Sequence, residues 1–286
     1  MKYAFMAAHK QEYSLKRMCH VLKVSRSGYY AWMRRGQSMR ARANEDLLAA
    51  IRRVFQISRR TYGSPRIHAY LRRQGYFCGR NRVARLMQKH KIVARKAHRR
   101  HPVTTRQNPL AKNAPNLLNQ EFSALLPNQK WVSDITYIDT AEGWLYLASI
   151  LDLYSRRVVG WAMSEQMDAS LVENALQMAL FTRQPSAGFL HHSDRGSQYT
   201  SEDYRNQLAA LQSQVSMSRT GNCYDNAVME SFFATLKVEC ASIQFPSKAE
   251  ARTTIFEYIE GWYNRQRIHS SLDYLSPKEF ELSSGH

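Results

Sequence analysis

The stretch KWVSDITYI, residues 130–138, is rich in β-branched and aromatic side chains, which is typical of a β-strand. Asp134 lies in the middle of it, and a charged side chain between apolar neighbours is costly unless it is paired or binds a metal ion. The next stretch, GWLYLASILDLYSRRVVGWAMS, residues 143–164, predicts two more strands joined near residues 152–157. The chain beyond residue 130 is therefore predicted to begin as a sheet whose first strand carries an acid.

Helices and short strands are predicted to alternate after these three strands. DASLVENALQMALF (residues 168–181) has the apolar spacing of a helix, and GFLHHS (188–193) is a short strand that ends just before Asp194. SEDYRNQLAAL (201–211) predicts a helix, QVSMS (214–218) a strand and DNAVMESFFATLKVECA (225–241) a helix. This order predicts an α/β fold in which helices cover a mixed sheet.

Positive charge is concentrated in the first 112 residues. They hold 28 Lys and Arg against three acids, a net charge of +25, whereas residues 113–286 hold 13 against 20, a net charge of −7. A solvated surface usually mixes both signs, so residues 1–112 are predicted to bind nucleic acid. A membrane surface is the weaker alternative, because the basic stretches are divided into short helical units rather than one amphipathic helix.

Two helical units are predicted in this basic part. SLKRMCHVLKVSRSGYYAWMRR, residues 14–35, has the spacing of a helix-turn-helix. In TYGSPRIHAYLRRQGYFCGRNRVARLMQKHKI, residues 61–92, Ser64 is predicted to cap a helix that has Pro65 at its first position, and Asn81 to open the next helix. A small solvated bundle is the alternative, and uniform positive charge argues against it. The candidate DNA-contacting residues here are Arg66, Arg80, Arg82, Arg85 and Lys89.

Other features of the sequence limit the class of protein. No run of about 18 apolar residues occurs, so no membrane span is expected. The N-terminus becomes charged too early for a signal peptide, and the four cysteines form no CxxC pair, which favours a reduced cytoplasmic protein. We expect helix-turn-helix-like units at residues 1–60 and 61–100, a linker at 101–125, where prolines and amides replace periodic apolar residues, and a catalytic core with a tail at 126–286.

Two further acids are candidate partners of Asp134. Asp194 lies in the polar stretch HSDRGSQYT, and Glu230 lies among apolar residues of the helix AVMESFFATLK. Two divalent cations about 3.5–4 Å apart can activate an attacking oxygen and stabilise a leaving oxygen in phosphodiester chemistry, and magnesium prefers oxygen ligands. Read singly, each acid is as readily a helix cap or a surface acid, and Glu239 on the same helix is expected to be a solvated or supporting acid.

A family resemblance favours the metal-binding interpretation. The stretches WVSDITYI, LDLYSRRVVGWAMS, HSDRGSQYTS, SMSRTGNCYDNAVMESFFATLKVE and YNRQRIHSSLDYLSPKEF resemble, in this order, the catalytic core of DDE transposases and retroviral integrases. YGSPRIHAYLRRQG extends the match into the basic half. More closely, the chain is similar to the second-reading-frame (OrfB) product of bacterial insertion sequences. The resemblance implies a ribonuclease-H-like core preceded by an all-α helix-turn-helix region.

The resemblance also implies roles for particular residues. Asp134, Asp194 and Glu230 match the catalytic, metal-binding acids, and Lys237 matches a basic position that can hold a DNA phosphate, with an ordinary exposed lysine as the alternative. His192, Arg195 and Gln198 surround the second acid and either orient it, touch DNA or stabilise the turn. Asn226 is expected to help start the catalytic helix. The tail residues are expected to pack on the core or to contact DNA: Tyr263, Asn264, Arg267 and His269.

The implied activity is DNA transposition. The core is expected to use two Mg²⁺ ions, with Mn²⁺ as a substitute, to cut a strand at the end of the element and to transfer the 3′-OH to other DNA. Expected partners are double-stranded DNA of element ends and target, further copies of the chain on DNA, and the upstream first-frame protein. Two alternatives stay open: a ribonuclease-H-like nuclease without joining activity, and a DNA-binding regulator of the full-length transposase.

Overall fold

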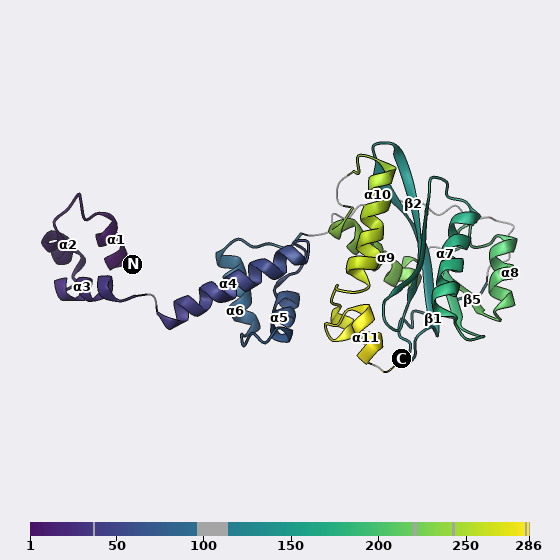
Figure 1. The fold of residues 1–286 in the computed structure, drawn as a ribbon, viewed down its shortest axis with the longest axis horizontal. Coiled ribbons are helices and arrows are strands. Elements are labelled where there is room, and N and C mark those ends of the chain that lie inside the picture. Colours follow the sequence, from purple (N-terminus) through teal and green to yellow (C-terminus); the bar gives the residue numbers. More distant parts are fainter. Residues whose placement is uncertain (37, 96–113, 220–221, 242–243, 284, 286) are drawn as a thin grey trace.

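A five-stranded mixed sheet forms the centre of the larger lobe in the computed structural model (Figure 1), which describes residues 1–286 except 37, 96–113, 220–221, 242–243, 284 and 286. The strand order is β3-β2-β1-β4-β5, with β1 antiparallel to β2, β2 antiparallel to β3, and β4 parallel to both β1 and β5. The predicted mixed sheet and the predicted order of strands and helices are confirmed. The strands are β1 (Lys130–Thr140), β2 (Gly143–Asp152), β3 (Val158–Ser164), β4 (Leu190–Ser193) and β5 (Gln214–Met217).

Helices cover both faces of the sheet (Figure 1). One face packs against α7 (Ala169–Arg183) and α8 (Glu202–Ala210), and their apolar side chains form one buried cluster with that face. The other face packs against α9 (Ala227–Glu239) and α10 (Lys248–Phe256). Gly160 of β3 allows the close approach of α7, because a Cβ at this position would overlap the carbonyl oxygen of Ala175.

The basic half of the chain folds as two separate helical units. The first unit, with α1 (Lys2–Ala8), α2 (Leu15–Leu22) and α3 (Arg26–Arg34), has its own small core. The second unit contains α4 (Met39–Ile57), α5 (Ser64–Arg73) and α6 (Arg80–Lys89), which pack on one another. The prediction that Ser64 caps α5 is wrong, because Gly63 occupies the N-cap and Ser64 is the first helical residue. The predicted opening of α6 at Asn81 is one residue late, since Arg80 begins the helix behind Gly79.

The structure bears on two of the expected segment boundaries, which remain predictions. The boundary at residue 60 separates α4 from α5 and α6, although Ile51 and Val54 of α4 are buried in the same cluster as Ile67 and Leu86. Residues 101–113 of the expected linker lie outside the described residues. Beyond them, the backbone N–H of Leu118 and that of its predecessor donate to Ser216 Oγ, and the side chain of Leu118 is buried.

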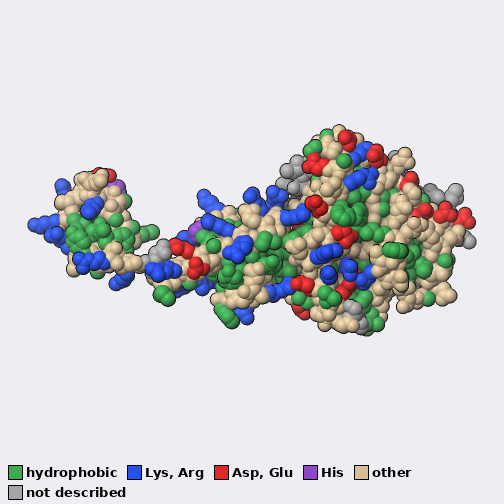
Figure 2. Space-filling model, viewed as in Figure 1, with side chains coloured by type: hydrophobic (Ala, Val, Ile, Leu, Met, Phe, Trp, Pro, Cys, Tyr) green, Lys and Arg blue, Asp and Glu red, His purple; other side chains and the backbone are tan. Residues whose placement is uncertain are grey.

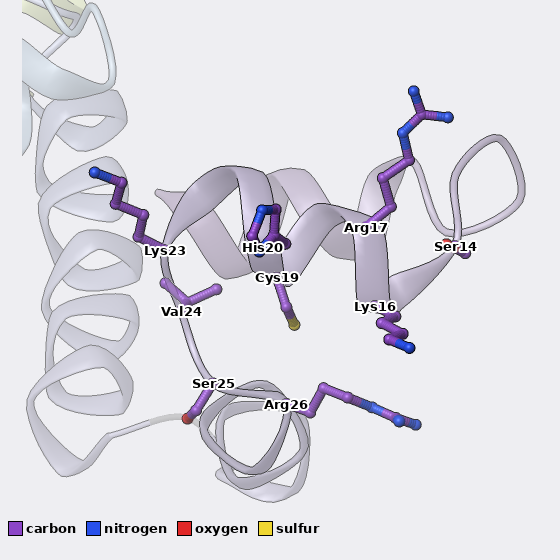
Figure 3. Close-up of a pocket in the computed structure, with 9 residues that line it drawn as sticks. All are labelled: Ser14, Lys16, Arg17, Cys19, His20, Lys23, Val24, Ser25 and Arg26. Atoms are coloured by element: carbon purple, nitrogen blue, oxygen red, sulfur yellow. The ribbon is translucent and has the colours of Figure 1, made fainter.

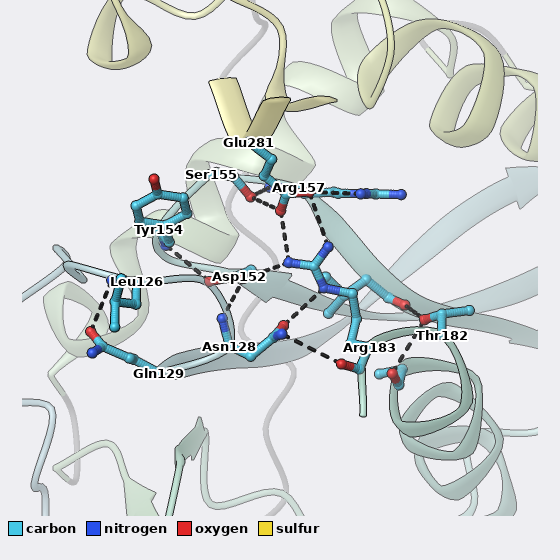
Figure 4. Close-up of polar contacts among 12 residues, drawn as sticks. Leu126, Asn128, Gln129, Asp152, Tyr154, Ser155, Arg157, Thr182, Arg183 and Glu281 are labelled. Carbon is cyan, nitrogen blue, oxygen red and sulfur yellow. Dashed lines mark hydrogen bonds and ion pairs between the residues drawn. The ribbon is translucent and has the colours of Figure 1, made fainter. Parts of the chain in front are cut away.

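The C-terminal tail consists of η2 (Glu257–Tyr263), a π-helical continuation of α10, then η3 (Ser270–Leu272) and α11 (Pro277–Ser283). Figure 4 shows how a buried network attaches α11 to the sheet. The Glu281 carboxylate accepts hydrogen bonds from Ser155 Oγ at 2.7 Å, from Arg157 Nη1 at 2.7 Å and from Arg183 Nη2 at 2.7 Å. Arg183 also pairs with buried Asp152 at 3.2 Å. Within the described residues, no helix has the length and apolarity needed to cross a membrane.

Candidate active site

Asp134 lies in the middle of β1, the central strand of the sheet. Successive side chains of a strand point to opposite faces, so Asp134 lies on the same face as Val132 and Ile138. Those two residues belong to the buried cluster that includes Met229 of α9, which places Asp134 on the α9 side of the sheet. Its Oδ1 accepts a hydrogen bond of 2.8 Å from the backbone N–H of Ile135.

Asp194 follows β4 directly and comes to the level of Asp134. In the parallel pairing of β1 and β4, Val132 lies opposite His192, so each acid lies two residues beyond a paired position. The Asp194 carboxylate accepts a hydrogen bond of 2.9 Å from the N–H of Gly196, which fixes its rotamer in the turn. A Cβ at Gly196 would lie 3.0 Å from Asp194 Oδ1, so a larger residue would push against the acid.

Glu230 lies in the first turn of α9 and is exposed. Asp194 and Glu230 both lie within electrostatic reach of Asp134. The pKa of Asp134 is raised well above its ordinary value, first by burial, then by the negative charge of Asp194 and, more weakly, by that of Glu230. The fold therefore brings Asp194 and Glu230 close to Asp134 in the interior of the sheet, where each of the two disfavours the ionisation of Asp134.

Lys237 lies two turns after Glu230 on α9 and is half-buried, so it is not an ordinary exposed lysine. Burial lowers the pKa of its ammonium, whereas the neighbouring Asp134 acts in the opposite direction. In turn, Lys237 lowers the pKa of Asp134. A cation therefore lies beside the cluster of acids, at a distance from which it can act on them.

The chemistry of this donor set fits a divalent cation of the magnesium type. Carboxylate oxygens are the ligands that such hard cations prefer, and the mutual repulsion around Asp134 is what a bound cation would neutralise. Among the described residues, no group of three or more His, Cys, Asp or Glu side chains is already arranged as a metal-ligand set. The three acids are thus neighbours whose carboxylates have not converged.

The residues around the second acid hold the turn in place. His192 is fully buried and its ring bonds to Ser216 Oγ at 2.8 Å and Ser218 Oγ at 3.1 Å, which ties β4 to β5 and the residue after it. Burial lowers the pKa of His192 to about 4, so the ring is neutral at pH 7. Arg195 Nε donates to the carbonyl of Ser218 at 2.7 Å, and Gln198 Nε2 donates to that of Met167 at 2.9 Å.

The start of α9 is attached to β1 beside the first acid. Asn226 is the N-cap residue, and its side-chain amide donates to the carbonyl of Ser133 at 3.3 Å instead of capping the helix. The preceding Asp225 is buried and accepts hydrogen bonds from the backbone and guanidinium of Arg219 at 2.8–3.1 Å and from Gln120 at 3.0 Å. Sequence reasoning did not identify Asp225 as an anchor, because neither the turn that brings Arg219 back to it nor the approach of Gln120, 105 residues away, follows from a local pattern.

The contacts of the tail residues attach the tail to the catalytic core. Asn264 bonds through its amide to the backbone N–H and C=O of Val158, both at 2.9 Å, and so binds the edge strand β3. The ring of Tyr263 packs edge-on against Phe232 of α9 at 4.9 Å. Arg267 is 4 % exposed and pairs with Glu239 at 3.0 Å, and its charge together with burial lowers the pKa of His269 well below its ordinary value. Of the two expectations for Glu239, the structure excludes a solvated acid and agrees with a supporting one.

The candidate DNA-contacting residues of the second helical unit differ in exposure. Arg80, Arg85 and Lys89 of α6 are exposed, whereas Arg82 is half-buried and donates to Asn44 Oδ1 at 2.9 Å. Arg66 is half-buried, and its guanidinium lies 5.6 Å from the centre of the Tyr62 ring. Figure 2 shows Lys and Arg gathered over the helical units, while Asp and Glu are more frequent over the catalytic lobe.

The first helical unit contains an open hollow of ≈ 790 Å³ between α2 and α3. Figure 3 shows basic side chains from both helices around it. Ser25 caps α3 by accepting a hydrogen bond of 3.0 Å from the N–H of Gly28. The basic residues that line the hollow are Lys16, Arg17, His20, Lys23 and Arg26.

Protein-family models match the region of the second helical unit and the catalytic lobe. An HTH-like domain model matches residues 42–101, and two integrase core domain models match residues 124–223 and 211–277. Among solved structures, the chain is similar to a chain of the simian T-cell lymphotropic virus intasome in complex with PP2A regulatory subunit B56 gamma, at 16% identity over 77% of this chain and 74% of that one, with a TM-score of 0.47. It is also similar to the catalytic core of BIV integrase, at 18% identity over 56% and 97% of the chains, with a TM-score of 0.42.

Curated relatives match almost the whole chain. The transposase InsF for insertion sequence IS3A of Escherichia coli is 46% identical over 98% of this chain and 98% of its own length. A 31 kDa protein of insertion element IS600 from Shigella sonnei is 48% identical over 92% of this chain and 97% of its own length. The chain therefore belongs to the IS3 family of OrfB-type transposases, which are DDE enzymes with an integrase catalytic core.

Proposed function

We propose that Asp134, Asp194 and Glu230 form the catalytic centre at which the chain cuts one DNA strand at an insertion-element end and joins the freed 3′-OH to another DNA. The observation that carries this proposal is the proximity of Asp194 and Glu230 to Asp134 near β1 and the end of β4, where burial, the charge of Asp194 and that of Glu230 together raise the pKa of Asp134. Such clusters of like charge are costly to maintain and are typical of sites built for metal ions.

The three carboxylates would hold two Mg²⁺ ions, with Mn²⁺ as a substitute. Bound metal would supply activation of the attacking oxygen and stabilisation of the leaving oxygen. Asp134 would be the most rigid ligand, because it lies mid-strand and its Oδ1 is held by the N–H of Ile135. Glu230 would close on the metal from α9, and Lys237 would hold a phosphate of the DNA strand beside the acids.

Residues 1–112 would supply most of the affinity for double-stranded DNA. Their net charge of +25 is set against a catalytic half with a net charge of −7, so attraction to phosphates must come from the helical units. We assign phosphate contacts to the exposed cations of α6 and to Lys237. Arg66 is half-buried, and its positive charge would attract DNA phosphates from within the fold. The hollow between α2 and α3 is a further surface for a phosphate backbone.

The chain would act in the bacterial cytoplasm, bound to DNA as several copies, together with the upstream first-frame protein. Element ends and target DNA would be its substrates. No observation favours a nuclease without joining activity or a regulator without catalysis.

The test is metal-dependent cleavage and joining of a labelled element-end duplex, with the full frameshifted protein used where the chain alone is inert. Asp134→Asn and Asp194→Asn are expected to lower both reactions by orders of magnitude, and EDTA to abolish them. Asp139→Asn is the matched control, because this exposed acid lies further along the same strand and bonds to Gln244. Activity that persists in EDTA or in Asp134→Asn would contradict the proposal.

A further inference from the structure

The second helical unit and the catalytic core share one hydrophobic core. Ile51 of α4, Ile67 of α5 and Leu86 of α6 belong to the same buried cluster as Phe232 of α9 and Trp262 of η2. The first helical unit has a separate cluster built from other residues. A shared core resists relative motion, because closely packed side chains cannot slide without losing contacts. The two parts therefore meet at a joint rather than at a flexible linker.

Tyr62 is the main apolar anchor of this joint. It lies in the short connection between α4 and α5, and its side chain is fully buried. Its hydroxyl accepts a hydrogen bond of 2.8 Å from the backbone N–H of Ile268 in the tail, and its ring lies 6.1 Å from that of Trp262. A buried tyrosine ring with a satisfied hydroxyl fixes both position and orientation.

Glu239 is the polar anchor on the catalytic side. It is the last residue of α9, nine positions after Glu230, and its side chain is 5 % exposed. Its carboxylate accepts hydrogen bonds from Arg267 Nε at 3.0 Å and from Trp262 Nε1 at 3.1 Å. It also accepts one of 3.4 Å from Thr61 Oγ1, beside Tyr62. One carboxylate thus collects donors from the catalytic tail and from the second helical unit.

The π-helical segment η2 allows several donors to reach this carboxylate. Tyr258 and Trp262 are four residues apart in η2, and both point their polar atoms at Glu239 Oε2 at 3.1 Å. Irregular helical turns of this kind are often found at functional positions. Burial alone would lower the pKa of Arg267, but the Glu239 carboxylate holds it above its ordinary value, so the guanidinium remains charged inside the joint.

We infer that Tyr62 and Glu239 are positioning residues that hold the second helical unit at one fixed place relative to α9. DNA bound on α6 would then be presented to Glu230 in a single register, and the joint would select which phosphodiester is cut. This inference rests on the proposed function, because it takes the DNA bound on α6 to be the DNA that is cut.

The position of the DNA strand relative to Glu230 depends on how firmly this joint holds α6 relative to α9. Glu230 and Glu239 are nine residues apart on one helix, about 13 Å along its axis. Neighbouring phosphates of a strand are about 3.4 Å apart along the duplex. A shift of about 3.4 Å between α6 and α9 would bring the next phosphodiester to the acids. The affinity of α6 for DNA would be unchanged by such a shift.

The test maps nick positions on a labelled element-end duplex for the full chain and for Tyr62→Ala. We expect the ratio of cutting at the authentic phosphodiester to cutting at its neighbours to fall by about tenfold or more, since misplacement by an ångström can cost about a hundredfold in rate. Duplex affinity is expected to stay within about twofold, because the cations that neutralise phosphates are intact. Thr61→Val combined with Tyr62→Phe removes the hydrogen bonds of both hydroxyls, including those to Glu239 and Ile268, and no ring. It is expected to shift the ratio in the same direction but less.

Two controls separate this inference from the proposed function. Thr61→Ser keeps the hydroxyl and is expected to keep the wild-type nick position. Glu230→Gln in the same assay is expected to lose nicks at every position. Nicks that persist in this variant would contradict the proposed function itself, and not only the inference about the joint. Where Tyr62→Ala does not fold, the Thr61→Val, Tyr62→Phe pair decides. A single unchanged nick position, or a uniform loss at all positions that follows the folded fraction, would overturn the inference.

Discussion

The two ends of α9 carry glutamates with opposite surroundings. Glu230 in the first turn is exposed, and its negative charge adds to burial and to the charge of Asp194 in raising the pKa of Asp134. Glu239 at the last position is buried and is surrounded by donors, one of them a charged guanidinium. The helix is one continuous element of 13 residues. It therefore connects a site where negative charges repel one another to a site where a negative charge is compensated by hydrogen-bond donors and a cation.

This contrast shows that the surroundings of a carboxylate distinguish a structural role from a ligand-binding role. A carboxylate that collects positive and hydrogen-bonding partners contributes to the fold, and its removal leaves those partners uncompensated. A carboxylate placed among like charges weakens the apo fold, and a bound cation would relieve that repulsion. The same residue type thus has a structural role at one end of α9 and a proposed catalytic role at the other.

The largest expected effect is that of Glu230→Gln on catalysis. If Glu230 is a metal ligand as proposed, its removal should lower cleavage and strand transfer by orders of magnitude, because the bound metal would help to position both reacting oxygens. The melting temperature should hold or rise, since one of three like charges is neutralised. Strand-transfer assays and calorimetry on the same preparation check both halves, and wild-type activity in this variant would break the comparison.

Glu239→Gln should do the reverse. Removing one partner of a buried ion pair costs about 3–5 kcal/mol, because the other charge remains buried without compensation. Chemical denaturation should therefore show a clear loss in the free energy of unfolding, with activity lost only as the folded fraction falls or the nick position spreads. The matched control is Glu257→Gln at the exposed first position of η2, which should change stability by no more than about 0.5 kcal/mol. An unchanged stability in Glu239→Gln would show that its partners do not depend on its charge.

A smaller effect is expected from the exposed cations of α6. The triple variant Arg80→Gln, Arg85→Gln and Lys89→Gln should lower the slope of log affinity against log salt by about 2.7, since each phosphate contact contributes about 0.9. The full chain is required, because α4–α6 share their core with the catalytic lobe. A control that removes the same charge from other exposed sites should leave the slope unchanged: Arg205→Gln, Arg265→Gln and Lys278→Gln. Equal slopes for the two triple variants would contradict the assignment of the DNA surface.

The smallest expected effect is the contribution of Asp225 to the pH dependence of stability. The negative charge of Asp225, like that of Glu239, is compensated by hydrogen-bond donors and an arginine. Hydrogen bonds from Arg219 lower the pKa of Asp225 in the folded state, so the unfolded state binds the proton first as pH falls. Its contribution to stability is therefore complete above about pH 5 and is lost as pH falls below about 4. Between pH 5 and 3 the stability of Asp225→Asn should fall less steeply than that of the wild type. Parallel curves would show that Arg219 does not favour the ionised form.

Local patterns in the sequence predicted the catalytic core better than the joint. An acid between β-branched residues marks Asp134, and a seven-residue spacing places Lys237 on the face of Glu230, so both predictions need only local geometry. The three acids were assigned through family motifs, and their catalytic role remains a proposal. The roles of Tyr62 and Glu239 depend on partners 206 and 178 residues away, which no local period encodes. The predicted Ser64 cap failed because Gly63 supplies the extended backbone before α5 equally well.

The central claim is that Asp134, Asp194 and Glu230 make one metal site, whereas Glu239 belongs to the fold. The most direct measurement is the rise in melting temperature on titration with Mn²⁺, compared among wild type, Glu230→Gln and Glu239→Gln. A ligand that binds the folded state alone raises its stability by mass action. We predict a rise for the wild type and for Glu239→Gln, which starts from a lower melting temperature, and no rise for Glu230→Gln. A full rise in Glu230→Gln, or its loss in Glu239→Gln alone, would contradict the claim.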